Sequence, residues 1–171
     1  MSGPLKGLKI LELTSVVLGP WAAQILADMG AEVIKVEAPF GDSNRQLGAS
    51  RNPGMAALYL SNNRNKRSLV LDLKQESAKN ALFEIIKDCD VFLHNNRPQV
   101  MTKLGLEYDQ ISEVNPSIVY CGTYGYGKDT DPLYKNIPFY ISLQRKTAYG
   151  IFFDNTFQSF FDFAHERSNV A

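Results

Sequence analysis

Apolar and polar positions along the first two thirds of the chain follow two alternating periods. Runs of strand length occur at 9–13, 32–36, 69–73, 91–93 and 118–121. Between them, apolar residues recur at helical spacing, most clearly over 74–90 at Ala78, Ala81, Leu82, Ile85, Ile86 and Cys89. Strands that alternate with helices predict an α/β fold, Rossmann-like, with a mainly parallel sheet and flanking helices.

Residues 7–39 form the best-defined strand, helix and strand unit. The strand 9–13 is followed by a loop that ends at Gly19-Pro20, and a helix is predicted over 21–29 with Gly30 just beyond it. The second strand, 32–36, has Glu37 at its carboxyl end. Ligands of parallel sheets bind where the strands end, so 14–19 and 37–41 are the first places to expect a site.

The pattern changes near Gly127. Nine of the nineteen aromatic residues fall within 137–163, and the alternation predicts strands at 137–143, 147–153 and 158–163. We therefore expect two segments, 1–127 and 128–171, the second a short antiparallel β tail. Its aromatic residues are typical of a sandwich core, or of an exposed apolar patch that favours self-association.

Composition excludes several classes of function. The formal net charge of this 171-residue chain is zero, which gives no support to a nucleic-acid or membrane partner. The two cysteines lie in unrelated contexts, which indicates neither a disulfide framework nor a metal site. The N-terminus has no apolar signal core, and no apolar run is long enough to span a bilayer. The expected location is the cytoplasm.

Several residues allow a functional and a structural interpretation. The loop 14–19 lacks the GxGxxG pattern, which argues against NAD although Glu37 lies near the place of a ribose-binding acid. The basic run Arg64, Lys66 and Arg67 either attracts phosphates or forms a solvated turn, and 38–54 reads as an exposed loop. His94 has the pKa of a general base but stands at a strand end. Cys89 is expected in the core, and Cys121 is not expected to be a nucleophile.

Five ordered pieces of residues 1–127 resemble the N-terminal part of the family III CoA-transferases. These pieces are PLKGLKILELT, LGPWAAQILADMGAEVIKVEAP, NRNKRSLVLDLK, DVFLHNNRPQVMTKLGLEY and NPSIVYCGTYGYG. The resemblance implies a Rossmann-like domain within an interlocked homodimer. It also implies acyl-CoA and a small carboxylic acid as substrates, with no metal.

The resemblance implies CoA contacts in four places. They are the loop residues Val16, Val17 and Leu18, the adenine and ribose lining Leu71, Asp72, Leu73 and Lys74, the strand-end residues Asn95, Asn96 and Arg97, and the phosphate-binding Lys103. Two positions depart from the family pattern, because Ala38 stands where Arg is frequent and Asn96 where Phe is usual.

The second segment resembles the N-terminal β-sandwich of family 31 glycoside hydrolases, the α-glucosidase type. The matching pieces are DPLYKNIPFYISL and AYGIFFDNTFQSFFDF. The family III register ends before the aspartate that forms the covalent acyl intermediate, so no catalytic residue is assigned. The sequence thus predicts a truncated CoA-transferase joined near Gly127 to a glycosidase fragment. The alternatives are a non-catalytic CoA-binding fragment, an α-glucosidase named from its tail, and a chain that folds poorly without function of its own.

Overall fold

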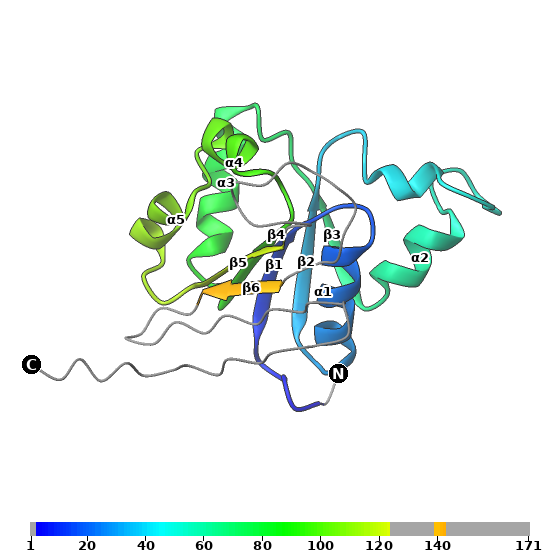
Figure 1. The fold of residues 1–171 in the computed structure, drawn as a ribbon, viewed down its shortest axis with the longest axis horizontal. Helices are drawn as coiled ribbons and strands as arrows, with labels where there is room; N and C mark the ends of the chain where they lie inside the picture. Colours follow the sequence, from blue (N-terminus) through cyan, green and yellow to red (C-terminus); the bar gives the residue numbers. More distant parts are fainter. Residues whose placement is uncertain (1–2, 124–138, 143–171) are drawn as a thin grey trace, which may run out of the picture.

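A computed structural model of the chain describes residues 3–123 and the backbone of residues 139–142. Five parallel strands make up the sheet in the order β3-β2-β1-β4-β5, as Figure 1 shows. They are β1 (Lys9–Leu13), β2 (Glu32–Glu37), β3 (Lys66–Val70), β4 (Val91–His94) and β5 (Val119–Thr123). The predicted α/β class and parallel sheet are therefore confirmed. A short strand, β6 (Phe139–Ser142), pairs antiparallel with β5. The predicted strands at 147–153 and 158–163 lie outside the described residues.

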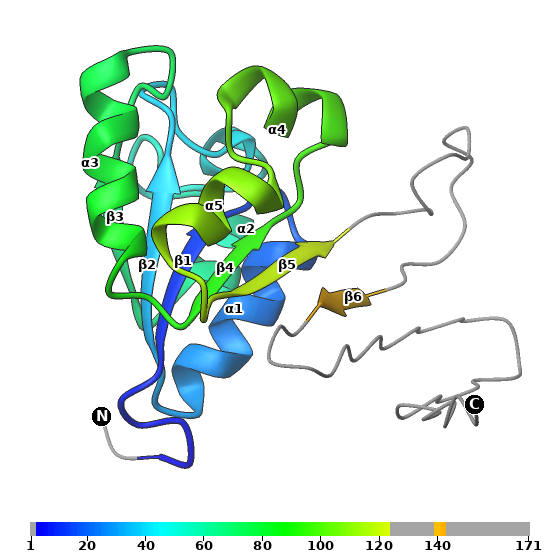
Figure 2. The ribbon, with the colours of Figure 1, turned by 90° about the vertical axis from the view of Figure 1, so that its left-hand side faces the viewer.

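Helices cover both faces of the sheet. One face carries α1 (Leu18–Asp28), α2 (Ala57–Asn63) and the 3-10 turn η1 (Ser43–Gln46), and the other carries α3 (Glu76–Ile86), α4 (Pro98–Leu104) and α5 (Tyr108–Val114). Figure 2 looks onto the face covered by α3, α4 and α5. The chain changes face once, when it leaves β3, so helices reach both sides without crossing connections.

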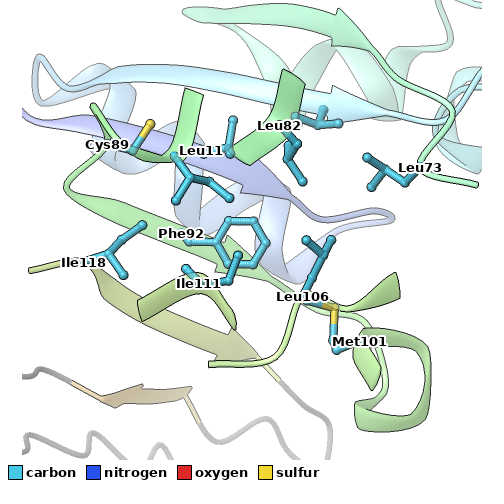
Figure 3. Close-up of a cluster of buried hydrophobic side chains, with 11 residues drawn as sticks. Leu11, Leu73, Leu82, Cys89, Phe92, Met101, Leu106, Ile111 and Ile118 are labelled. Carbon is cyan, nitrogen blue, oxygen red and sulfur yellow. The ribbon is translucent and has the colours of Figure 1, made fainter. Parts of the chain in front are cut away.

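Each face of the sheet has its own apolar core. Figure 3 shows the larger one, in which Leu11 and Phe92 from neighbouring strands pack against Leu82 of α3 and Ile111 of α5. The smaller core lies under α1 and comprises Ile10, Ala23, Ala27, Ala31, Val33, Leu93 and Cys121. Successive strand residues point to opposite faces, so Ile10 and Leu11 enter different cores. Both faces are buried, as expected of a parallel sheet.

Several element boundaries differ from the prediction. The third strand covers Lys66–Val70 instead of 69–73, since its first residue pairs with Val33 of β2 and its last with Glu37. Lys66 and Arg67 of the basic run are thus part of the strand, which the apolar pattern could not indicate. The first helix begins at Leu18, so Pro20 lies in its first turn as expected, and Gly30 follows with a φ of 103°. The longest predicted helix shortens from 74–90 to Glu76–Ile86, because turns flank it on both sides.

The larger core should dominate the stability of this domain. Leu82→Ala is expected to lower the free energy of unfolding by about 2–5 kcal/mol, because it leaves a cavity at a fully buried position. Leu60→Ala is the matched control, since Leu60 lies on α2 with 47% of its surface exposed. Urea unfolding followed by circular dichroism measures both. Equal midpoint shifts for the two variants would contradict this assignment of the core.

Candidate functional site

The loops after β1 and β4 meet where the sheet reverses its winding. β1 and β4 are neighbours, but the chain leaves β1 toward α1 and leaves β4 toward α4 on the opposite face. At this point the Asn95 amide accepts the N–H of Ser15 at 3.0 Å and donates to its carbonyl at 2.8 Å. Asn96 donates to the carbonyl of Leu13 at 3.1 Å. In open α/β sheets, ligands bind at switch points of this kind, beyond the carboxyl ends of the strands.

Val16 lies at this switch point with a backbone conformation that valine rarely adopts. Its φ is 71°, a left-handed value that costs about 1–3 kcal/mol for a β-branched residue and persists only where the surroundings enforce it. The loop after β2 supplies that enforcement. The Val16 N–H donates to Asp42 Oδ1 at 3.2 Å, and the Asn44 amide donates to the Val16 carbonyl.

A buried ion cluster supports the same loop from below. Lys35 is 1% exposed, and its Nζ lies 3.1 Å from Asp42 Oδ2 and 3.5 Å from Glu12 Oε1. Its third contact is the carbonyl of Thr14, at 2.9 Å. The ammonium group donates hydrogen bonds to Glu12 and Thr14, and its contact with Asp42 is an ion pair. Thr14 also donates its hydroxyl hydrogen to Glu12.

Lys66 is the second cation of this cluster. Its Nζ lies 2.8 Å from Glu12 Oε2 and donates to the Pro20 carbonyl at 2.7 Å and to Asn63 Oδ1 at 3.0 Å. Burial lowers the pKa of Lys66 to about 8, although the Glu12 carboxylate works in the opposite direction. The ion pair joins β1 to β3 across the intervening strand.

Glu37 is the centre of a second buried group. Its carboxylate accepts two hydrogen bonds from Arg45, both 2.7 Å, one from Tyr59 at 2.9 Å and one from the N–H of Asp42 at 2.9 Å. Burial alone would raise the pKa of Glu37, but the hydrogen bonds from Arg45, Asp42 and Tyr59 outweigh it and hold the pKa at about 2. Burial, together with the Glu37 carboxylate, raises the pKa of Tyr59. A carboxylate engaged in this way has no role as a ribose-binding acid.

Gly19 permits the close packing of this loop on itself. A Cβ at this position would lie 2.5 Å from the Cβ of Thr14. The group that lies closest to Gly19 is therefore a side chain of this same chain. Val16 and Val17 remain on the surface, 47% and 38% exposed.

Comparison with known proteins shows to which family the chain belongs. The profile described as "CoA-transferase family III" matches residues 5–141. The chain belongs to CoA-transferase family III. Human succinyl-CoA:glutarate CoA-transferase is 44% identical over 131 residues, 76% of this chain and 30% of that protein. Acetyl-CoA:oxalate CoA-transferase of Acetobacter aceti is 41% identical over 133 residues, 77% of this chain and 33% of that protein. The crystal structure of Rv3272 from M. tuberculosis superposes with a TM-score of 0.70 at 41% identity, covering 76% of this chain and 37% of that one.

The family match defines how far the resemblance extends. The chain spans about a third of the length of the curated relatives it matches. The match runs past the boundary predicted near Gly127. It therefore includes the first part of the segment for which a glycosidase origin was predicted. No finding supports that second resemblance, and the residues that carry it lie largely outside the described ones. The division at 127 and the interlocked dimer stay predictions.

The residues after β3 that were predicted to contact CoA differ in their exposure. The Leu71 N–H donates to the carbonyl of Glu37 at 2.9 Å, which continues the pairing of β3 with β2. Leu73 is buried in the larger core, so its side chain is withdrawn from any ligand. Asp72 accepts the N–H of Lys74 at 3.2 Å, and the side chain of Lys74 is exposed.

Two further cations that were predicted to contact CoA lie in or next to α4. Arg97 precedes this helix and is exposed, and Lys103 lies exposed in its last turn. Figure 1 shows α4 and the loops after β1 and β3 at the same edge of the sheet. The structure thus places Lys74, Arg97 and Lys103 at the edge where the parallel strands end.

His94 and the two cysteines behave as structural residues. His94 ends β4 and is fully buried beside Phe92 and Tyr120, with ring centroids 5.9 and 5.0 Å away. Burial lowers the pKa of His94 to about 4, which keeps the imidazole neutral at pH 7. Burial raises the pKa of Cys89 to about 11 and that of Cys121 to about 12. Cys89 lies in the core as predicted, and neither thiol has the lowered pKa of a nucleophile.

Neither interpretation of the basic run describes all three of its residues. Arg64 and Arg67 are exposed and pair with Asp28 and Glu32, which agrees with a solvated surface. Lys66 contradicts both the phosphate and the solvent interpretation, since its side chain is 2% exposed and bound to Glu12. Lysine is buried only when it is paired, and the partner lies 54 positions earlier in the sequence.

The prediction of an exposed loop at 38–54 is wrong for its central residues. Asp42 is 5% and Asn44 1% exposed, and both support the loop after β1. The only local signal is that Asp42 accepts the N–H of Asn44 at 3.0 Å, a turn that the residue types favour. Such a signal indicates a turn but not its distant partner. Among residues 3–123, no group of His, Cys, Asp and Glu could hold a metal ion, and no helix could cross a membrane.

Removing one charge from the ion cluster should destabilise the fold strongly. Glu12→Gln is expected to cost about 3–5 kcal/mol of unfolding free energy, because Lys66 then stays buried without its counter-charge. The double variant Glu12→Gln/Lys66→Met should recover part of this loss. Glu113→Gln, an exposed position on α5, is the control. Denaturant unfolding of the wild type, the two single variants and the double variant measures the free energies of this double-mutant cycle. If the loss in the double variant equalled the sum of the two single losses, Glu12 and Lys66 would not be coupled.

The carboxylate of Glu37 should make the free energy of unfolding decrease as the pH falls into the acid range. Its folded pKa of about 2 lies below the ordinary value of 4.5, so its contribution is complete above pH 4.5 and disappears as the pH falls toward 2. The pKa difference corresponds to about 3 kcal/mol. Thermal unfolding between pH 7 and pH 2.5 should show a steeper loss for the wild type than for Glu37→Gln. Parallel curves would contradict this assignment.

Proposed function

We propose that this chain binds the CoA part of an acyl-CoA where the loops after β1 and β4 meet. The binding serves transfer of CoA between an acyl-CoA and a small carboxylic acid. The observation that carries the proposal is the pair of hydrogen bonds between Asn95 and Ser15. They join two segments that resemble CoA contacts of the family and are 80 positions apart in the sequence.

The surface at this edge has the chemistry that CoA requires. Lys74, Arg97 and Lys103 are exposed cations for the phosphate groups. Val16 and Val17 offer exposed apolar side chains for the pantetheine arm. Residues 71–74 supply the backbone that we assign to the adenine and ribose.

The relatives suggest the reaction class. They are named for exchange between succinyl-CoA and glutarate and between acetyl-CoA and oxalate. Applied to this chain, R–CO–SCoA and R′–COO⁻ would give R–COO⁻ and R′–CO–SCoA. The acid pair is left open, because no described residue selects it.

We do not propose any of the described carboxylates as the nucleophile that attacks the thioester. Glu12, Glu37 and Asp42 lie beneath the site, but each is buried in an ion pair. A carboxylate that accepts several hydrogen bonds is a weak nucleophile. Because these three side chains are buried, they also lie out of reach of a ligand. The role of residues 3–123 is therefore to bind and orient the CoA. A CoA-binding segment without turnover of its own is the second candidate function, and the same burial favours it.

Calorimetry with CoA on the full chain tests the proposal. We expect micromolar binding that weakens about three- to tenfold in Lys74→Ala or Lys103→Ala, because a phosphate contact is lost. Lys6→Ala is the matched control, since this exposed lysine precedes β1 at the opposite edge. An acyl-CoA exchange assay on the same sample separates the two candidates, because only a transferase shows exchange. A folded chain without affinity for CoA would overturn both.

A further inference from the structure

We propose that Asp42 and Asn44 are positioning residues for CoA binding, and this inference rests on the proposed function. They hold Val16 in its left-handed conformation, although neither can touch the ligand. The two residues belong to the loop after β2, for which the sequence indicated only an exposed connection.

The contacts of Val16 show how the positioning works. Its N–H donates to Asp42 Oδ1, and its carbonyl accepts from the Asn44 amide. Asn95 binds both backbone polar groups of the preceding residue, Ser15. The loop is thus fixed from two strands at once, and the side chains of Val16 and Val17 are left on the surface.

Burial separates this role from direct binding. Asp42 and Asn44 are 5% and 1% exposed, whereas Val16 is 47% exposed. Any effect of the two residues on CoA must therefore pass through the backbone of the loop. Asp42 is itself fixed by Lys35 at 3.1 Å and through its own N–H by Glu37 at 2.9 Å. A rigid support of this kind lowers the ordering entropy that a ligand would otherwise have to overcome.

The experiment compares two ligands on the full chain by calorimetry. CoA reaches the loop after β1, whereas adenosine 3′,5′-bisphosphate reaches only the nucleotide part assigned to residues 71–74. Asn44→Ala and Asp42→Ala should weaken CoA about tenfold and the bisphosphate less than twofold, because only the loop is released. Asp42→Asn keeps an acceptor for Val16 and should lose less than Asp42→Ala. Asp88→Asn, exposed beyond the end of α3, is the matched control.

Hydrogen exchange of the Val16 amide, followed by NMR, reports the loop directly. Protection should be lost in Asn44→Ala and Asp42→Ala and kept in Asp88→Asn. If Asp42→Ala does not fold, Asn44→Ala and Asn44→Asp carry the test, since Asn44→Asp places a carboxylate against the Val16 carbonyl.

Two results would overturn the inference. One is unchanged CoA affinity in a variant whose Val16 amide has lost protection. The other is an equal loss of affinity for both ligands, which would mean general destabilisation. Failure of the wild type to bind CoA is a distinct result, because it removes the proposed function before any variant is made.

Discussion

The structure at this site depends on one constraint, which is that Val16 must keep a backbone conformation that valine disfavours. Val16 donates its N–H to Asp42 and accepts a hydrogen bond from Asn44 at its carbonyl, and Asn95 holds the preceding residue, Ser15. A glycine at position 16 would adopt this conformation without support. A valine needs this support, and its apolar side chain is then presented on the surface at the switch point.

The buried charges below the loop follow from the same constraint. A loop held by Asp42 needs a cation to balance that carboxylate, and Lys35 supplies it. Lys35 also faces Glu12, whose second oxygen binds Lys66. With Glu37 and Arg45 the cluster contains three carboxylates and three cations, so the buried charge sums to zero. A neutral cluster avoids the large penalty that an unpaired ion would suffer, and it makes the geometry depend on every member.

The predictions from sequence were accurate where the pattern is local. Apolar runs placed four of the five parallel strands to within two residues, and helical spacing indicated the helix α3. The third strand was displaced because it begins with Lys66, a residue whose burial depends on a partner in another strand. The candidate site shows the same division. The loop after β1 and Asn95 could be named from family motifs, but Asp42 and Asn44 could not, because Val16, the residue that they hold, lies more than twenty positions away.

Asn95 connects this framework to the ligand that the family resemblance implies. Its amide oxygen and nitrogen each make one hydrogen bond to Ser15. A primary amide has two acceptor sites and two donor hydrogens, so one of each is left. The side chain is half-buried, so it stays partly accessible at the switch point. Under the proposed function, Asn95 can both fix the loop and contact CoA. Replacing it would then disturb the loop and the binding, whereas Asp42 and Asn44 are buried and can act only through the loop.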